Sequence, residues 1–127
     1  MATIQAPSFN RALFQGTYGN ASMEESVVDL NAAAEGTEIQ LLSLPAGIRI
    51  YMFVLVTDGL GAGVTVTLKI GDVPVSLDNG LADAEAKTVG MIPIDIPTDS
   101  ALSAVIGGGA ATGKLCVMAL YKSVGTD

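Results

Sequence analysis

Hydrophobic residues along the chain occur in short runs that Gly, Pro, Asn and Asp separate. Residues 64–70 alternate between aliphatic side chains and Thr or Lys, which is the period-two pattern of a strand with one buried face. No run shows a convincing 3.6-residue period of an amphipathic helix. The runs predict about eight strands, at residues 26–30, 38–44, 48–57, 64–70, 73–77, 89–96, 101–106 and 114–124.

Strands that recur about every 8–12 residues between such turns are typical of antiparallel all-β domains. We therefore expect an all-β fold, a jelly-roll-like antiparallel sandwich or a small barrel, with the strand order left open. Pro93 lies within a predicted strand, and because proline donates no ladder hydrogen bond, that strand should lie at a sheet edge or contain a bulge. The polar residues 78–87 fit either a loop or a short helical turn.

Two of the runs, residues 48–56 and 115–121, are apolar on both faces. A sheet with one face in water should alternate instead. Residues 48–57 therefore predict a central strand with little exposure, and the apolar surplus predicts that an additional face is covered. The covering element is either the N-terminal segment or another subunit.

Residues 1–23 differ from the remainder of the chain, which we expect to be a single β domain over residues 24–127. They contain Phe9, Phe14 and Tyr18, half of the six aromatic residues, and they show a period of neither 2 nor 3.6. This pattern fits an extended N-terminal arm, and it equally fits a first strand folded over the core.

Composition narrows the possible functions. The 127 residues correspond to one domain, and 15% charged residues, against about 25% in a typical soluble domain, indicate that a partner covers part of the surface. Histidine is absent and cysteine occurs once, so the usual catalytic triads, zinc sites and disulfide frameworks are nearly all excluded. We expect no enzymatic activity and no cofactor. Cys116 lies within an apolar run and is predicted to be a small buried residue.

Charge and hydropathy exclude two further classes. Six basic against thirteen acidic residues give a net charge of −7, the wrong sign for binding a phosphate backbone, so we expect no direct contact with nucleic acid. The longest apolar runs, residues 50–56 and 115–121, are far shorter than the roughly 20 residues of a membrane-spanning helix, so we expect no membrane association. The first residues lack the basic and apolar regions of a signal peptide, which predicts synthesis and retention in a cytoplasm.

Three short motifs imitate functional sites. Residues 108–114 match G-x-x-x-x-G-K, but Leu115 replaces the Ser or Thr that binds Mg²⁺ and a strand pattern follows, so we predict a hairpin turn. The glycine-rich residues 59–63 lack the third glycine and the helix of a dinucleotide loop and also predict a turn. The third motif is a cluster of acidic residues, Asp78, Asp83 and Glu85. Its spacing does not match that of a calcium-binding loop, so we interpret it as a solvated loop.

Four turn and strand-start motifs carry a family resemblance. They are NAAAEGTEI at residues 31–39, LPAGIRI at 44–50, TDGLGAGV at 57–64 and GAATG at 109–113. In these motifs the chain resembles small virion structural proteins of tailed bacteriophages, and within that group it looks most like the head decoration, or cement, proteins.

The resemblance implies a jelly roll or small β-barrel on the outer surface of a capsid, commonly a homotrimer, that bridges neighbouring subunits of the major capsid protein. The expected location is therefore the virion, after synthesis in the host cytoplasm. The resemblance covers residues 31–124, leaves the N-terminal segment unmatched, and implies no catalytic residue, cofactor or metal.

An arm that becomes ordered on docking would add contact area at an entropic cost. In that case Phe9, Phe14 and Tyr18 would be aromatic anchors at the partner interface and Arg11 a polar contact. Two alternatives remain. One is a tail, connector or head-fibre protein with an adhesion or joining role. The other is a small hydrolase or ligand-binding β-barrel, against which the residue inventory argues.

Overall fold

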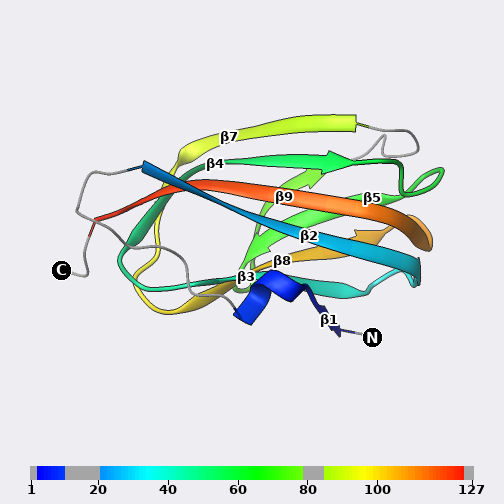
Figure 1. The fold of residues 1–127 in the computed structure, drawn as a ribbon, viewed down its shortest axis with the longest axis horizontal. Coiled ribbons are helices and arrows are strands. Elements are labelled where there is room, and N and C mark those ends of the chain that lie inside the picture. The colour runs from blue at the N-terminus through cyan, green and yellow to red at the C-terminus, as the bar shows by residue number, and fades with distance from the viewer. Residues whose placement is uncertain (1–2, 11–20, 79–84, 125–127) are drawn as a thin grey trace.

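The computed structural model describes residues 3–10, 21–78 and 85–124 (Figure 1). Within these ranges the chain forms nine strands and one short 3-10 helix, and no α-helix occurs there. The elements are β1 (Thr3–Gln5), η1 (Pro7–Asn10), β2 (Ala21–Ala33), β3 (Glu38–Leu44), β4 (Ile48–Thr57), β5 (Thr65–Ile70), β6 (Val73–Asp78), β7 (Glu85–Asp95), β8 (Ser100–Gly107) and β9 (Ala111–Ser123).

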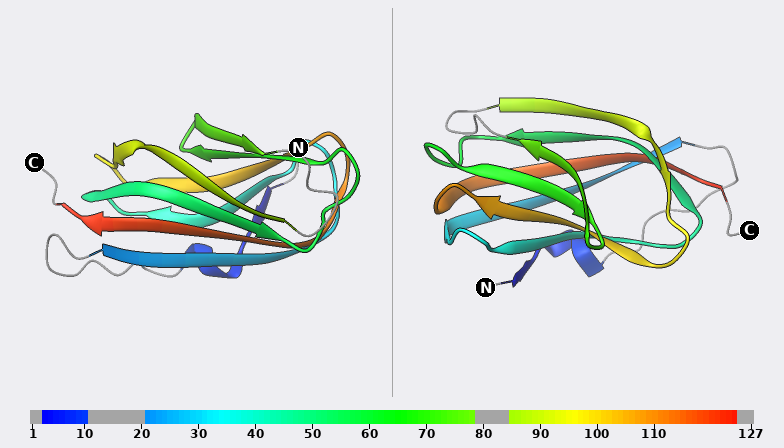
Figure 2. Two further views of the ribbon diagram at one scale, coloured as in Figure 1. Left: turned by 90° about the horizontal axis from the view of Figure 1, so that it is seen from above. Right: turned by 180° about the vertical axis from the view of Figure 1, so that it is seen from behind.

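Strands β2 to β9 form a nested series of antiparallel pairs, in which β2 pairs with β9, β3 with β8, β4 with β7 and β5 with β6. Because β9 also pairs with β4 and β8 with β5, this long hairpin closes into two sheets. The sheets have the orders β2-β9-β4-β7 and β1-β3-β8-β5-β6 and form the two layers in Figure 2. The arrangement is a jelly-roll sandwich. The predicted all-β jelly roll is confirmed, and the chain does not adopt the small-barrel alternative.

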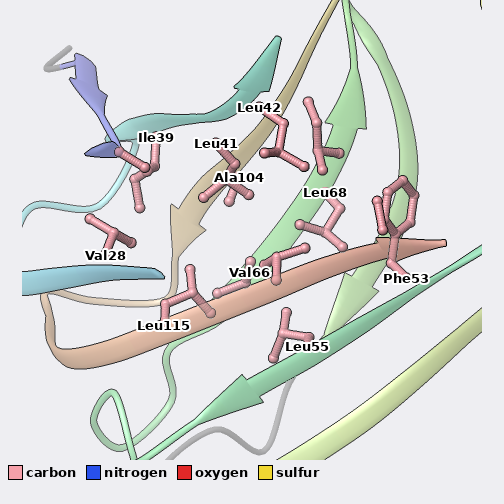
Figure 3. Close-up of a cluster of buried hydrophobic side chains, with 14 of the residues drawn as sticks. Val28, Ile39, Leu41, Leu42, Phe53, Leu55, Val66, Leu68, Ala104 and Leu115 are labelled. Atoms are coloured by element: carbon pink, nitrogen blue, oxygen red, sulfur yellow. The ribbon is translucent and has the colours of Figure 1, made fainter. Parts of the chain in front are cut away.

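The core lies between the two layers and is built almost entirely from aliphatic side chains (Figure 3). Leu55 and Leu115 from the four-stranded sheet, and Leu41, Val66 and Leu68 from the five-stranded sheet, are each fully buried. Burying one such side chain contributes about 1.5–3 kcal/mol, so the inner faces of both sheets supply the main stabilisation of the fold.

The strand predictions hold over most of the described chain. β3 and β4 have the predicted bounds, and β4 lies inside its sheet between β9 and β7, as its apolar sequence indicated. Pro93 lies in β7, which is an edge strand, and the register shifts beside it: Met52 pairs with Gly90, whereas Ile50 pairs with Ile94. The edge and the bulge that proline requires are therefore both present.

Residues 3–10 are folded against the rest of the sandwich. β1 pairs in parallel with the start of β3, and η1 contacts β3 and β2. The buried Ser8 hydroxyl is hydrogen-bonded to the Ser26 hydroxyl at 2.6 Å and to the Leu41 carbonyl oxygen at 2.8 Å. Residues 11–20 lie outside the described residues, so the division of the chain into an arm up to residue 23 and a domain after it stays a prediction.

The glycine-rich match to a phosphate-binding loop is a turn that leads from β8 in the five-stranded sheet to β9 in the four-stranded sheet. The prediction of a turn is right, but the predicted hairpin is wrong, because β8 and β9 do not pair with each other. Gly108 has a φ of +77°, and a Cβ at this position would overlap the carbonyl oxygen of Gly63 in the β4–β5 loop. Lys114 lies within β9, so no helix follows the turn. Across the described ranges, no helix has the length and hydropathy needed to span a membrane.

Candidate interface on the outer face of the four-stranded sheet

The outward side of the sheet β2-β9-β4-β7 is apolar across its centre. Directly paired antiparallel residues project to the same side of a sheet, so the register places these side chains in cross-strand rows. Three successive rows are Val27–Cys116–Val56–Ala86, Glu25–Met118–Val54–Thr88 and Met23–Leu120–Met52. We refer to the apolar residues of these rows as the apolar face: Met23, Val27, Met52, Val54, Val56, Ala86, Cys116, Met118 and Leu120.

The apolar face is in contact with solvent. Met23 is 54% and Val27 40% exposed, although large hydrophobic side chains are usually buried. The central residues on β4 and β9 are partly exposed, in contrast to their fully buried neighbours Leu55 and Val117. The described N-terminal elements β1 and η1 lie along β3 and one edge of β2 (Figure 1). They leave the outward side of β4 and β9 uncovered.

A charged pair lies at each end of the apolar face. At one end Lys114 Nζ lies 3.8 Å from Asp29 Oδ1, and at the other Arg49 Nε lies 2.6 Å from Asp95 Oδ1. The hydrogen bond from the Arg49 guanidinium to the Asp95 carboxylate raises the pKa of Arg49 and lowers the pKa of Asp95. Each end of the face therefore carries opposite charges that neutralise each other within the chain.

The second charged end also carries an aromatic ring. Lys122, which pairs with Arg49 across β9 and β4, has its Nζ 5.7 Å from the centre of the Tyr51 ring. This distance is within the range of a cation–π contact. The polar groups at this end therefore interact with one another along the sheet, and the apolar centre of the face is the part left for contact with another molecule.

Cys116 lies in one of the three rows and not in the core. Leu115 and Val117 on either side of it face inward, so the alternation of the strand turns the thiol outward, and the prediction of a buried residue is corrected to a partly exposed one. Desolvation by its apolar neighbours, and secondarily the negative charge of Glu25, raise the pKa of the thiol above its ordinary value. At neutral pH it is a protonated, weakly polar part of the apolar face.

Two hollows border the row of Val27, Cys116 and Val56. One of about 310 Å³ lies on the β2 side, and one of about 230 Å³ lies at the end of β4. The first is lined by Pro7, Ser8, Glu25 and Val27, and the second by Val56, Thr57, Asp58, Lys114 and Cys116. Both hollows continue the apolar face and give it relief into which side chains of another molecule can fit.

The structure describes one of the four residues predicted at a partner interface. Phe9 ends up partly buried in η1, where its carbonyl oxygen accepts a hydrogen bond from Ser43 Oγ at 2.8 Å. Arg11, Phe14 and Tyr18 lie outside the described residues, so the structure does not bring the four together.

The acidic residues predicted to form a solvated loop also fall largely outside the described part: Asp83 lies in residues 79–84, and the side chains of Asp78 and Glu85 are not described. Among the described residues, no group of three or more His, Cys, Asp and Glu side chains could hold a metal ion.

Part of the apolar face was not singled out from the sequence. The surplus in residues 48–56 and 115–121 pointed to β4 and β9, but Met23 and Val27 were missed. The sequence held a partial signal, because the apolar Val28 and Leu30 flank Asp29 and indicate an inward even-numbered side. The structure agrees, since the even-numbered positions 26, 28 and 30 are buried and the odd-numbered positions of β2 face outward. Recognising that signal required knowing that β2 pairs with β9.

Comparison with solved structures finds this fold in chains of phage capsids. A chain in the capsid of Ralstonia phage GP4 matches with a TM-score of 0.69 at 17% identity, over 99% of this chain and 100% of the other. A chain in the acidic stable capsid of Helicobacter pylori bacteriophage KHP30 matches with 0.62 at 12% identity, over 83% and 88%. A chain in the cyanophage Pam1 capsid asymmetric unit matches with 0.62 at 19% identity, over 94% and 95%.

In comparisons of sequence, no protein-family model and no curated protein matches the chain. The three structural matches nevertheless confirm, at the level of the fold, the resemblance to phage virion proteins that the turn motifs indicated.

Proposed function

We propose that the protein is a virion structural protein that decorates a phage capsid and stabilises it by bridging subunits of the major capsid protein. The fold shared with chains of three phage capsids supports a virion role. The observation that carries the proposal is the apolar face, because a partly exposed apolar surface bounded by charged pairs is typical of a protein–protein contact. A structural role needs contact area rather than catalytic groups.

In this proposal the protein binds the outer surface of the capsid as a homotrimer, as the resemblance to decoration proteins implies. Several linked copies that dock on a symmetric shell bind far more tightly than one copy, because each further contact forms at a high effective concentration. Each contact with the major capsid protein can then be weak while the complete lattice of contacts is strong.

The N-terminal segment supplies the contact with the major capsid protein. Phe9 lies at the described end of this segment, and the chain continues through Arg11, Phe14 and Tyr18. Aromatic side chains are enriched among the residues that dominate binding energy, and arginine contributes polar contacts at such sites. We propose these four residues as the docking contacts of the segment.

Cosedimentation with empty shells of the phage's major capsid protein tests this function. A variant with Arg11→Ala, Phe14→Ala and Tyr18→Ala together leaves β1, η1 and β2 intact, whereas deletion of residues 1–23 would remove β1, η1 and the start of β2. We expect the triple variant to bind at least about tenfold more weakly.

The matched control is Val73→Ala, which trims a 65% exposed side chain on β6 and should bind like the unaltered protein. Equal binding by the triple variant would contradict the role of the N-terminal segment. Failure of the unaltered protein to bind shells would contradict decoration as a whole.

The alternative role in a tail, connector or head fibre would be favoured by exposed aromatic residues that could bind a saccharide. Of the aromatic residues outside the N-terminal segment, Phe53 and Tyr121 are buried in the core. Tyr51 is partly exposed, and its ring lies beside Lys122. No aromatic cluster occurs among the described residues, so capsid decoration remains our proposal.

A further inference from the structure

The apolar face has the properties of a contact between identical chains, and we propose that a second copy of this protein covers it. This inference deepens the proposed function by assigning the surface through which copies associate. It rests on that function only in taking the working form to be an oligomer.

Charge is the first argument for a second copy. At the outward positions that the register assigns to this sheet, Arg49, Lys114 and Lys122 are balanced by three acidic residues, Glu25, Asp29 and Asp95. The whole chain has 6 basic and 13 acidic residues, so subtracting three of each leaves the entire net charge of −7 on other parts of the chain.

Two identical chains with this charge repel each other over most of their surfaces. The outward side of the four-stranded sheet is neutral, so it is the surface on which this repulsion is weakest. Like-charge contacts cost free energy at an interface, and neutral apolar surfaces avoid that cost. The charge distribution thus favours contact between copies at the apolar face.

Contact area is the second argument. Four strands about 4.8 Å apart, each contributing a length of about eight residues at about 3.4 Å per residue, give a sheet face of about 500 Å². If such a face packs on another copy, about 1,000 Å² is removed from water in total, which reaches the lower limit for a specific interface. Sheets pack face to face in this way about 10 Å apart. The expected association is specific and depends on protein concentration.

The native mass of the purified protein, measured by sedimentation over a range of concentrations, tests the proposal. Val54 and Leu120 lie on inner strands of the sheet and belong to the apolar face. We expect Val54→Lys and Leu120→Lys each to shift the midpoint of association to at least about tenfold higher concentration, because a lysine there must be desolvated on contact. Either change makes the net charge less negative, so greater repulsion between copies cannot explain the shift.

The matched control is Thr67→Lys. Thr67 lies on β5, an inner strand of the other sheet, and it is outward-facing and partly exposed like Val54. This variant should associate like the unaltered protein. A protein that is monomeric at every concentration, or an equal shift in all three variants, would overturn the proposal. A dimer or a trimer that only the apolar-face variants dissociate would support it.

Cys116 provides a readout that needs no substitution. It is the chain's one cysteine and belongs to the apolar face. We expect the rate constant for modification of its thiol by a maleimide to fall at least about tenfold as concentration rises through the association range, since contact excludes the reagent. A rate constant that stays unchanged while the mass rises would assign association to another surface and overturn the proposal.

Shell binding separates this inference from the proposed function. If the unaltered protein associates through the apolar face but does not cosediment with shells, the contact between copies stands and decoration fails. If it cosediments but remains monomeric in solution with a freely reactive Cys116, decoration stands and the contact between copies fails.

Discussion

The inner faces of the two sheets are both apolar, but their outer faces differ in polarity. On the outward side of the five-stranded sheet, paired residues form rows such as Gln40–Ser103–Lys69 and Glu38–Val105–Thr67, which are mostly polar. The corresponding rows on the four-stranded sheet are made of Val, Met, Leu, Ala and Cys with Glu and Thr at the edges. The fold needs the two inner faces to be apolar and makes no such demand on the outer ones.

The polar outer face is satisfied within the chain. Lys69 Nζ lies 3.2 Å from Glu38 Oε1, and Gln5 Nε2 donates a hydrogen bond to Gln40 Oε1 at 2.8 Å. The aliphatic side chains of the apolar face can form no such ion pairs or hydrogen bonds, either within the chain or with water. The monomer fold therefore explains the polar outer face but not the apolar face, and four further measurements test this contrast.

The largest effect should come from substituting neighbouring residues that face opposite ways on β4. Leu55→Ala empties a fully buried position and should lower the free energy of unfolding by about 2–5 kcal/mol. Val54→Ala, one residue away on the outward side, should cost less than about 1 kcal/mol in the dissociated protein. Urea denaturation at low protein concentration measures both. Equal losses would mean that Val54 is already covered within a single chain.

A smaller loss in the free energy of unfolding is expected from a substitution where the N-terminal segment packs on the sandwich. Ser8→Ala removes the buried hydroxyl that bonds Ser26 and the Leu41 carbonyl oxygen and should destabilise the fold by about 1–3 kcal/mol. Thr3→Ala, at an exposed position on β1, is the control and should change little. Thermal unfolding compares the two. If Ser8→Ala behaves like its control, residues 3–10 contribute little to the sandwich.

The ion pairs on the two outer faces should also differ in how much they contribute to stability. Lys69 and Glu38 are 20% and 27% exposed, whereas Lys114 and Asp29 at the end of the apolar face are 57% and 81% exposed. Double-mutant cycles with alanine should give a coupling of up to about 1 kcal/mol for the first pair and near zero for the second, because water screens exposed pairs. A stronger coupling for the second pair in the monomer would contradict its solvent exposure.

The smallest expected effect is a pH dependence of the free energy of unfolding that comes from Cys116. Burial raises the pKa of the Cys116 thiol in the folded chain above its ordinary value of 9.0, so the folded state holds the proton more tightly than the unfolded state. Its contribution to stability is therefore fully present below the ordinary thiol pKa and is lost as pH rises through the folded value. Denaturation of the unaltered protein should show a small alkaline loss that Cys116→Val lacks. Parallel pH profiles for the two proteins would contradict a shielded thiol.

Much of this structure was accessible from the sequence because its signals are local. The alternation of residues 64–70, the proline and glycine turns, and the two-sided apolar run at 48–57 depend on neighbours along the chain, so β3, β4 and β5 were predicted nearly to the residue. The bulge at Pro93 was also foreseeable, because proline lacks the donor that a regular ladder requires.

The all-β class, the positions of most strands and the excess of apolar residues in two of them thus follow from local sequence patterns. The pairing of β2 with β9 and of β9 with β4 became known from the fold, and it joins Met23 and Val27 to those apolar residues as one face. Local patterns could not show this, because strand pairing connects residues far apart in the chain. A strand's alternation identifies its two sides but does not identify its neighbours.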